Sequence, residues 1–199
     1  MALGPSATAD ESAPVDERVV LDDVGIRRAL MRIAHEIVER NEDLSDLYLV
    51  AIPNGGVPLA RQLSRNLREI AGAEPALGIL DTTLYRDDLS SSGSRPVLRE
   101  TEMPSSVDDK VVVLVEDVVN TGRTIRAAMD ALMDFGRPRS VQVVALVDRG
   151  HRELPIRIDF AGKNIPTQAD EKVRLVAEES GEGPMRAVVC RQEGRGGRA

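Results

Sequence analysis

The feature that most constrains this chain is a run of five aliphatic residues, 111–115, that leads directly into two acids. An uninterrupted apolar run of this kind is typical of a central parallel strand with both faces covered. Glu116 and Asp117 would then lie at the carboxyl end of the strand, where open α/β sheets bind their ligands. A polar turn, 116–124, precedes a predicted helix over 125–135. The segment therefore predicts a strand, a turn and a helix, with a ligand site at the turn.

The residues of this turn have the chemistry of a phosphate site. Backbone N–H groups at the start of a helix bind phosphate. The hydroxyls of Thr121 and Thr124 would add donors, and Gly122 would let the ligand approach the backbone closely. Carboxylates beside a phosphate are unfavourable unless they bind something else, such as ribose hydroxyls or a Mg²⁺ that bridges to a pyrophosphate. The pattern indicates a site for 5-phosphoribosyl 1-pyrophosphate (PRPP).

Other interpretations of the turn fit less well. A P-loop needs the pattern G-x-x-x-x-G-K-[ST], and the turn has no lysine at the required place. The dinucleotide pattern G-x-G-x-x-G is absent, since Gly55 and Gly56 are only a pair. A capped helix after an ordinary buried strand remains the structural alternative, although two adjacent acids at this place are costly without a ligand.

Apolar spacing predicts further helices and strands along the chain. The helices are expected from Asp22 or Asp23 to about Asn41 and over 57–70, and the strands over 47–52, 77–84, 141–147, 173–176 and 185–189. The last two strands would form a hairpin across 179–184. The segment 87–109 has little periodicity, and loops of this length are usually functional lids or disordered. The alternation predicts an α/β fold with a mainly parallel twisted sheet flanked by helices.

Length and composition favour one domain. With 199 residues, we expect a domain over 18–192 between disordered tails at 1–17 and 193–199. The net charge of -7 means that nucleic-acid binding would need a local basic patch, and the scarcity of aromatic residues argues against a base-stacking platform. A single cysteine, Cys190, and the lack of a signal segment or an apolar run of membrane-spanning length predict a soluble cytoplasmic protein.

Several segments resemble one family of type I phosphoribosyltransferases, the pyrimidine-operon regulators with uracil phosphoribosyltransferase activity (PyrR). These segments are VVLVEDVVNTGRT (112–124), IRRAL (26–30), RIAHE (32–36), TLYRDDL (83–89), VDRGHRELPIR (147–157) and GKNIPT (162–167). The resemblance runs from about Val20 to Val189, and the run 147–157 is its most specific part. It implies the type I phosphoribosyltransferase fold, with a flexible hood loop over 84–104 and a C-terminal β-hairpin.

The resemblance also implies how PRPP is bound. Glu116 and Asp117 would hold the ribose hydroxyls, the segment 121–124 would wrap the 5-phosphate, and the segment 53–56 would be the pyrophosphate loop. The implied binding residues are Asn54, Gly55, Gly56, Glu116, Asp117, Thr121, Gly122, Arg123, Thr124 and Arg149. Uracil would lie near 147–150, with Arg149 beside it.

By the same resemblance, the hood closes over the reaction. Arg86 would neutralise the leaving pyrophosphate, and together with Glu116 and Asp117 it completes the expected catalytic set. Asp87 or Asp88 would contact the Mg²⁺ that accompanies PRPP. Closure would exclude water from a transition state that resembles an oxocarbenium ion, so that catalysis is mainly positioning and charge stabilisation. The implied reaction is uracil plus PRPP giving UMP and pyrophosphate.

A second implied activity is RNA binding. In the family, uridine nucleotides such as UMP and UTP promote binding to the leader of the pyrimidine operon mRNA, and transcription attenuates. The candidate RNA-binding residues are Arg28, Arg32, His35, Arg40, Arg152, Arg157 and Lys163. If their segments adjoin, they form a basic patch sufficient for a salt-dependent RNA site. The alternative is that they are ordinary solvated charges. The resemblance also implies assembly as a homodimer or a larger homo-oligomer.

The chain departs from the family pattern in the pyrophosphate loop, where Gly55 stands in place of the usual arginine. Asn120 also stands where the family usually has a tyrosine. Three hypotheses therefore stay open. The chain is an enzyme that also regulates, or a regulator that senses UMP or UTP with little catalysis, or a phosphoribosyltransferase for another base.

Overall fold

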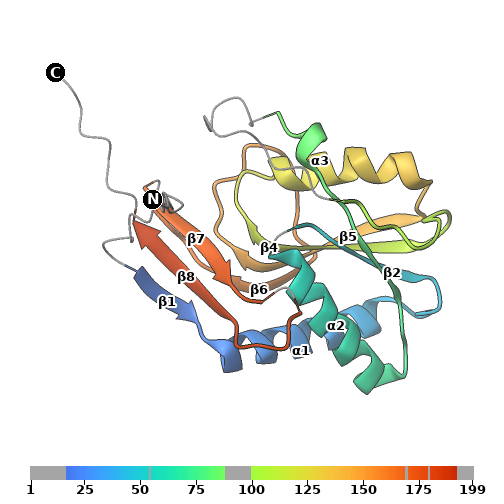
Figure 1. Ribbon diagram of the computed structural model, residues 1–199, viewed down its shortest axis with the longest axis horizontal. Helices are drawn as coiled ribbons and strands as arrows, with labels where there is room; N and C mark the ends of the chain where they lie inside the picture. Colours follow the sequence, from blue (N-terminus) through green and yellow to red (C-terminus); the bar gives the residue numbers. More distant parts are fainter. Residues whose placement is uncertain (1–16, 54, 88–99, 169, 179, 192–199) are drawn as a thin grey trace, which may run out of the picture.

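The computed structural model describes residues 17–53, 55–87, 100–168, 170–178 and 180–191, which form two sheets and the helices that cover them (Figure 1). The elements in chain order are β1 (Glu17–Leu21), α1 (Asp23–Arg40), β2 (Leu47–Ala51), α2 (Gly56–Ala71), β3 (Ala76–Ile79), η1 (Thr83–Tyr85), β4 (Val111–Val119), α3 (Arg123–Leu132), η3 (Met133–Phe135), β5 (Ser140–Asp148), β6 (Phe160–Asn164), β7 (Glu171–Val176) and β8 (Arg186–Arg191). The predicted α/β class is confirmed, because the larger sheet is parallel throughout with strand order β3-β2-β4-β5-β6.

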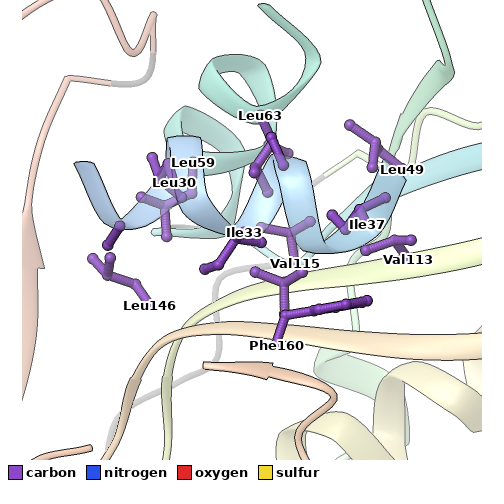
Figure 2. Packing of buried hydrophobic residues seen from close by; sticks show 14 of the residues in the cluster. Leu30, Ile33, Ile37, Leu49, Leu59, Leu63, Val113, Val115, Leu146 and Phe160 are labelled. Carbon is purple, nitrogen blue, oxygen red and sulfur yellow. The ribbon is translucent and has the colours of Figure 1, made fainter. Parts of the chain in front are cut away.

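The parallel sheet is covered on both faces. Alternate residues of β4 face opposite sides, so that Val113 and Val115 join the core beneath α1 and α2, whereas Val112 and Leu114 join the core beneath α3. Figure 2 shows the first of these cores. Its labelled side chains include Leu30, Ile33 and Ile37 of α1, Leu59 and Leu63 of α2, and Val113 and Val115 of β4. Burial on both faces explains why 111–115 is apolar without interruption.

Helix α1 begins and ends where its sequence predicts. Asp22 is its N-cap, and the Asp22 side chain accepts a hydrogen bond of 2.8 Å from the backbone N–H of Gly25. This bond satisfies one of the free N–H groups of the first turn. The helix ends at Arg40, and the buried side chain of Asn41 donates to the Ile37 carbonyl at 2.8 Å. Both ends of the helix are thus determined by local side-chain chemistry.

Strand β4 is longer than its apolar run. Its pairing with β5 continues through Glu116, opposite Ala145, and Val119, opposite Asp148. The expected polar turn over 116–124 is therefore wrong for its first four residues, which are extended. The reason is that β5 offers a partner for the backbone of these residues, and Val118 and Val119 are β-branched residues that favour a strand. The acids are held by the sheet rather than by a loop.

The second sheet is antiparallel, with strand order β1-β8-β7. The hairpin predicted from the last two apolar runs is confirmed, because β7 pairs with β8 from Glu171 opposite Arg191 to Val176 opposite Arg186. Strand β1 adds to the other edge of β8, although its first residue, Glu17, falls at the end of the segment expected to be a tail. Residues 1–16 and 192–199, where most of both expected tails lie, are outside the described residues.

Two predicted elements end earlier than expected, and strand β6 was not predicted. The strand predicted over 77–84 ends at Ile79, and 83–85 is a short 3₁₀ helix. The helix predicted over 125–135 is α3 up to Leu132, followed by the 3₁₀ turn η3. Strand β6 lies in a segment expected to be a charged connection. Only its pairing with β5 reveals it, since its sequence FAGKN has little strand pattern.

Candidate functional site

The two acids of β4 lie at the carboxyl end of the parallel sheet. A cavity of about 490 Å³ opens beside Asp117. Its lining residues are Pro53, Gly55, Asp117, Val118, Asn120, Arg149, Lys172, Val173, Arg174 and Leu175. They come from the β2–α2 loop, from β4, from the end of β5 and from β7. The strand thus brings the acidic pair to the meeting point of both sheets.

Glu116, the residue before Asp117, does not line this cavity and is buried, with 8% of its surface exposed. Its Oε2 atom has no hydrogen-bond partner among the described residues. Burial raises the pKa of Glu116 well above its ordinary value, the charge of Asp117 raises this pKa further, and Arg86 lowers it. A ligand that donates hydrogen bonds or brings a cation would relieve this unfavourable state of the ionised carboxylate. The structure therefore fits the expectation that this acid binds part of a ligand.

Asp117 is held between β4 and β7. Burial raises the pKa of its carboxyl, and backbone hydrogen bonds from Val118, from Asp117 itself and from Leu175 oppose that rise. The bond from Leu175 joins the antiparallel sheet to the acid of the parallel sheet. Asp117 therefore has backbone hydrogen-bond donors that Glu116 lacks. The two neighbouring acids are suited to different roles.

The segment after β4 forms a second, smaller cavity of about 110 Å³. Its lining residues are Arg86, Val118, Val119, Asn120, Thr121, Gly122, Thr124 and Ile125. Gly122 is the N-cap of α3 and has φ +92°, a left-handed conformation that favours glycine. Arg86 donates to the Thr124 hydroxyl at 3.2 Å. The two cavities share Val118 and Asn120 and therefore adjoin.

The backbone carbonyls of residues 119–121 accept hydrogen bonds from the segment that follows β5. The Val119 carbonyl accepts from the backbone N–H of Arg149 at 3.1 Å. The Asn120 carbonyl accepts from the Arg152 guanidinium at 2.7 Å, and the Thr121 carbonyl accepts from Glu153 N–H at 3.0 Å. Carbonyl oxygens would repel a phosphate, and here the carbonyls of the turn are engaged by the run after β5.

The base of the expected hood is tied to α3. Arg123 makes an ion pair of 2.6 Å with Asp87 and another of 2.9 Å with Glu153. Arg126 donates to the Tyr85 carbonyl at 2.8 Å, and the Tyr85 hydroxyl hydrogen-bonds to Asp134. Asp87, expected to contact magnesium, is thus engaged with an arginine of the phosphate turn. Asp88 and residues up to 99 lie outside the described residues.

The expected pyrophosphate loop packs directly against β4. A Cβ atom at Gly55 would lie 2.3 Å from Asp117 Oδ2, and one at Gly56 would lie 2.3 Å from the Val115 carbonyl oxygen. Both positions therefore require glycine in this arrangement, because such distances do not occur between real atoms of these types. Asn54 lies outside the described residues. The close approach brings the loop to the rim of the larger cavity.

Arg149 lines the larger cavity and is 9% exposed. Its guanidinium donates to the Thr167 hydroxyl at 2.9 Å and to the Gln168 carbonyl at 3.3 Å. His151 has φ +56°, and its Nε2 lies 2.8 Å from the Thr167 carbonyl oxygen. These contacts fix the segment that leads into β7. Arg149 therefore shapes the cavity wall through its partners as well as through its charge.

The seven candidate RNA-binding residues do not all lie together. Arg28, Arg32, His35 and Arg40 are exposed along α1. Arg32 donates to the Ala161 and Gly162 carbonyls of β6 at 2.9 Å, so α1 and β6 adjoin, and Lys163 lies on β6. These five residues are called the α1–β6 surface below.

Arg152 and Arg157 lie in the connection between β5 and β6. Arg152 is engaged at the phosphate turn, with 22% of its side chain exposed and an ion pair of 2.8 Å to Asp148. Arg157 is exposed and makes no hydrogen bond or ion pair within the described part of the chain. The structure thus places five of the seven candidates on two adjoining elements and places Arg152 beside the turn that follows β4.

Sequence reasoning missed the contribution of β7 to the site. Lys172 and Arg174 line the larger cavity together with Val173 and Leu175. The alternation of charged and aliphatic residues in EKVRLV was the available signal, since it indicates a strand with one face exposed. It did not show that this strand faces the acids of β4.

Metal and membrane features are limited within the described residues. No cluster of three or more His, Cys, Asp or Glu side chains there is arranged to hold a metal ion. No described helix is both long enough and apolar enough to cross a membrane.

Comparisons with known proteins agree with this architecture. The family model described as phosphoribosyl transferase domain matches residues 20–178. The chain is 54% identical over 170 residues to the bifunctional protein PyrR of Pelotomaculum thermopropionicum, covering 85% of this chain and 93% of that protein. It is 53% identical over 169 residues to the bifunctional protein PyrR of Thermus thermophilus, with the same two coverages, 85% and 93%.

Solved structures share the fold at low sequence identity. A hypoxanthine phosphoribosyltransferase from Staphylococcus aureus matches with a TM-score of 0.60 and 20% identity, covering 80% of this chain and 81% of that chain. The hypoxanthine phosphoribosyl transferase of Trypanosoma cruzi matches with a TM-score of 0.62 and 22% identity, covering 80% and 82%. At this identity the likeness concerns the fold alone, and it confirms the type I phosphoribosyltransferase architecture.

Proposed function

We propose, since this chain belongs to the PyrR family and carries a phosphoribosyl transferase domain, that it transfers the phosphoribosyl group of PRPP to uracil and also regulates a pyrimidine operon by binding its leader mRNA. The observation that carries the first activity is the pair of adjoining cavities at the carboxyl end of β4. One has the donors of a phosphate site, and the other is lined by Asp117, whose neighbour Glu116 is buried. In PRPP the ribose lies between the 5-phosphate and the pyrophosphate. The two adjoining cavities could hold these groups in the same order.

In the proposed reaction, the turn after β4 binds the 5-phosphate. Arg149, Arg152 and Glu153 bind the carbonyls of this turn, so those oxygens are already engaged when the anion binds. Thr124 and Arg86, already in contact at 3.2 Å, add a hydroxyl and a guanidinium to the same cavity. Glu116 and Asp117 accept hydrogen bonds from the ribose hydroxyls. A fixed phosphate and a fixed ribose orient the anomeric carbon towards the base.

The chemistry requires no covalent nucleophile from the protein. The bond from the anomeric carbon to pyrophosphate breaks as positive charge develops on the ribose. The uracil nitrogen forms the new bond to that carbon and releases its proton to the departing pyrophosphate or to solvent. The carboxylates of Glu116 and Asp117 lie close to where this charge develops, and they stabilise it through the low-dielectric surroundings that also raise their pKa values. Arg149 lines the same cavity and lies beside the proposed place of the base.

A magnesium ion that arrives on PRPP fits this site. Mg²⁺ commonly keeps several waters and takes one or two protein carboxylates along with the substrate's phosphates. The unpartnered Oε2 of Glu116 and the carboxylate of Asp117 are oxygen ligands of that kind. Asp87, proposed with Asp88 as a further contact, would have to leave its ion pair with Arg123. When bound, the ion would neutralise charge on the departing pyrophosphate.

The proposed RNA site is the α1–β6 surface, extended by Arg152 and Arg157. On a chain of net charge -7, a local group of cations is what phosphate binding needs. Arg152 connects this proposal to the nucleotide site, because it binds the Asn120 carbonyl at 2.7 Å and Asp148 at 2.8 Å. A uridine nucleotide in the phosphate turn would favour one arrangement of this connection and thereby change RNA affinity.

A second candidate function is a nucleotide sensor with weak catalysis. It is favoured by the pyrophosphate loop, since its described residues Pro53, Gly55 and Gly56 offer no cation. Placing an arginine at Gly55 is not a clean test, because any side chain there would collide with Asp117 in this arrangement. The cytoplasmic location and the homo-oligomeric assembly expected from the sequence remain predictions.

The deciding experiment measures UMP formation from uracil and PRPP with Mg²⁺, with Asp117→Asn as the variant. We expect turnover and UMP binding in the parent, and loss of turnover in the variant. UMP binding without turnover in the parent would favour the sensor. Faster reaction with hypoxanthine or guanine than with uracil would overturn the uracil assignment. UMP-dependent binding of a pyrimidine-operon leader RNA tests the regulatory activity separately.

A further inference from the structure

The larger cavity has an unequal distribution of charge. The side formed by Pro53, Gly55 and Asp117 carries a carboxylate and no cation. Among the described lining residues, the cations are Arg149, Lys172 and Arg174. A pyrophosphate entering this cavity would meet repulsion from Asp117 unless one of these cations opposed it.

Two of the three cations are engaged with other groups. Arg149 binds the Thr167 hydroxyl and the Gln168 carbonyl. Arg174 makes an ion pair of 2.7 Å with Glu17 of β1 and also contacts the Cys190 thiol. Lys172 is exposed and makes no hydrogen bond or ion pair within the described residues. Its ammonium group is therefore the one most available to a ligand.

Strand β7 is fixed in a position that keeps Lys172 at the cavity. It is the edge strand of its sheet, with β8 on one side only. Its other edge is turned towards the acids, because the Leu175 backbone donates to the Asp117 carboxylate. Lys172 and Arg174 alternate along the strand with Val173 and Leu175, so the side chains of both cations project from the same face of the sheet. The anchor at Leu175 holds this pair of cations beside the cavity.

We propose that Lys172 binds the pyrophosphate of PRPP, with Arg174 adding a second positive charge at the same rim. The inference rests on the proposed function and goes further by assigning the pyrophosphate contact to β7, rather than to the β2–α2 loop alone. An ammonium group on an exposed strand can follow the pyrophosphate as it departs. Since negative charge builds on that group as the bond breaks, Lys172 binds more strongly in the transition state than in the bound substrate.

Pyrophosphate and UMP separate this role from a structural one. PRPP and inorganic pyrophosphate contain the group that Lys172 would bind, whereas UMP contains only the 5-phosphate, ribose and base. The test compares Lys172→Gln and Lys172→Arg with the parent. It measures the affinity for inorganic pyrophosphate with Mg²⁺, the affinity for UMP, and the KM for PRPP.

We expect Lys172→Gln to weaken pyrophosphate binding and to raise the KM for PRPP roughly tenfold, the effect of losing one charged hydrogen bond. UMP affinity should stay unchanged, and Lys172→Arg should restore most of the pyrophosphate affinity. Arg186→Gln is the matched control, since Arg186 is an exposed cation of β8 in the same sheet and does not line the cavity. It should alter none of the three quantities.

Equal weakening of UMP and pyrophosphate binding by Lys172→Gln would overturn the inference, as would unchanged pyrophosphate binding. The same loss in Arg186→Gln would also overturn it, because the effect would then come from overall charge. Failure of the proposed function is recognised separately. It would appear as absence of UMP formation by the parent, and direct titration with magnesium pyrophosphate would still decide the role of Lys172.

Discussion

The two phosphate-binding ends of the proposed site are built in different ways. The 5-phosphate end is one continuous segment, 119–124, whose carbonyls are bound by the run 149–154. The pyrophosphate end is assembled from Gly55 before α2, Asp117 on β4 and Lys172 on β7. The first end carries its binding chemistry in adjacent residues. The second exists only because the fold brings distant segments together.

The two ends also differ in their electrostatics before a ligand binds. The 5-phosphate end has donors in place, with Arg86 already in contact with Thr124. The other end contains buried carboxylates whose pKa values are raised, chiefly by burial. One end is thus preorganised for an anion, whereas the other needs the cations of β7, a metal ion or ribose hydroxyls to balance its acids. Four experiments test this contrast.

The largest effect is expected at Gly122, because the 5-phosphate end depends on its backbone conformation. Valine at φ +92° is strained, and its Cβ would lie 3.0 Å from Ile156 Cγ1. Gly122→Val should lower the free energy of unfolding by about 1–3 kcal/mol and abolish the binding of both UMP and PRPP. Urea denaturation and UMP titration measure these effects. A variant that binds UMP normally would show that this turn is not the 5-phosphate site.

A smaller effect is expected from Thr124→Val, which removes one hydroxyl and leaves the backbone unchanged. The affinities for UMP and PRPP should both fall roughly tenfold, because each ligand carries the 5-phosphate. Affinity for inorganic pyrophosphate should not change. This pattern is the opposite of the one expected for Lys172→Gln. If the two variants weaken the same ligands, the proposed division of the site into two ends is wrong.

The acids between the two ends predict a pH dependence. Because the pKa of Glu116 is raised above its ordinary value of 4.5, the folded chain retains a proton that the unfolded chain releases. The contribution of the Glu116 carboxyl to the stability of the fold is therefore greatest at low pH. This contribution is lost as the pH rises from 4.5 through the raised pKa. In Glu116→Gln this loss should be absent, so the stability of the variant relative to the parent should rise with pH.

Denaturation midpoints of parent and variant, measured at several pH values across the neutral and mildly acidic range, test this expectation. Asp117→Asn is a useful companion, since backbone donors oppose the rise in its pKa and a weaker pH effect is expected. Parallel pH profiles for the parent and Glu116→Gln would contradict the assignment of a raised pKa to Glu116.

The smallest effect on catalysis is expected from the α1–β6 surface, because none of its five residues lines either cavity. Arg28→Gln should leave UMP formation unchanged and reduce the salt dependence of RNA binding by about one unit of slope. Arg152→Gln should behave differently, because Arg152 binds the Asn120 carbonyl of the 5-phosphate end. Loss of RNA binding in both variants, with weaker UMP binding in Arg152→Gln alone, would support a connection between the two sites.

Much of the fold was predictable because its signals are local. The Asp22 cap, the spacing along α1 and the apolar run of β4 each depend on neighbouring residues. The strand β6 was not predictable, because its backbone becomes extended through pairing with β5 rather than through its own sequence. The extension of β4 past Glu116 has the same cause. Pairing partners distant in sequence decided both.

The sequence by itself determined the α/β class, the acidic pair at the end of a central strand and the glycine- and threonine-containing turn that follows it. These features are encoded by residues next to one another, where apolar runs, glycine and hydroxyl groups act over a few positions. Only the tertiary structure decided that Gly55 packs against Asp117, that Arg152 supports the phosphate turn and that β7 places Lys172 at the cavity. Those contacts join segments far apart in the chain. Their energies depend on distances that are set only when the segments pack together in the folded protein.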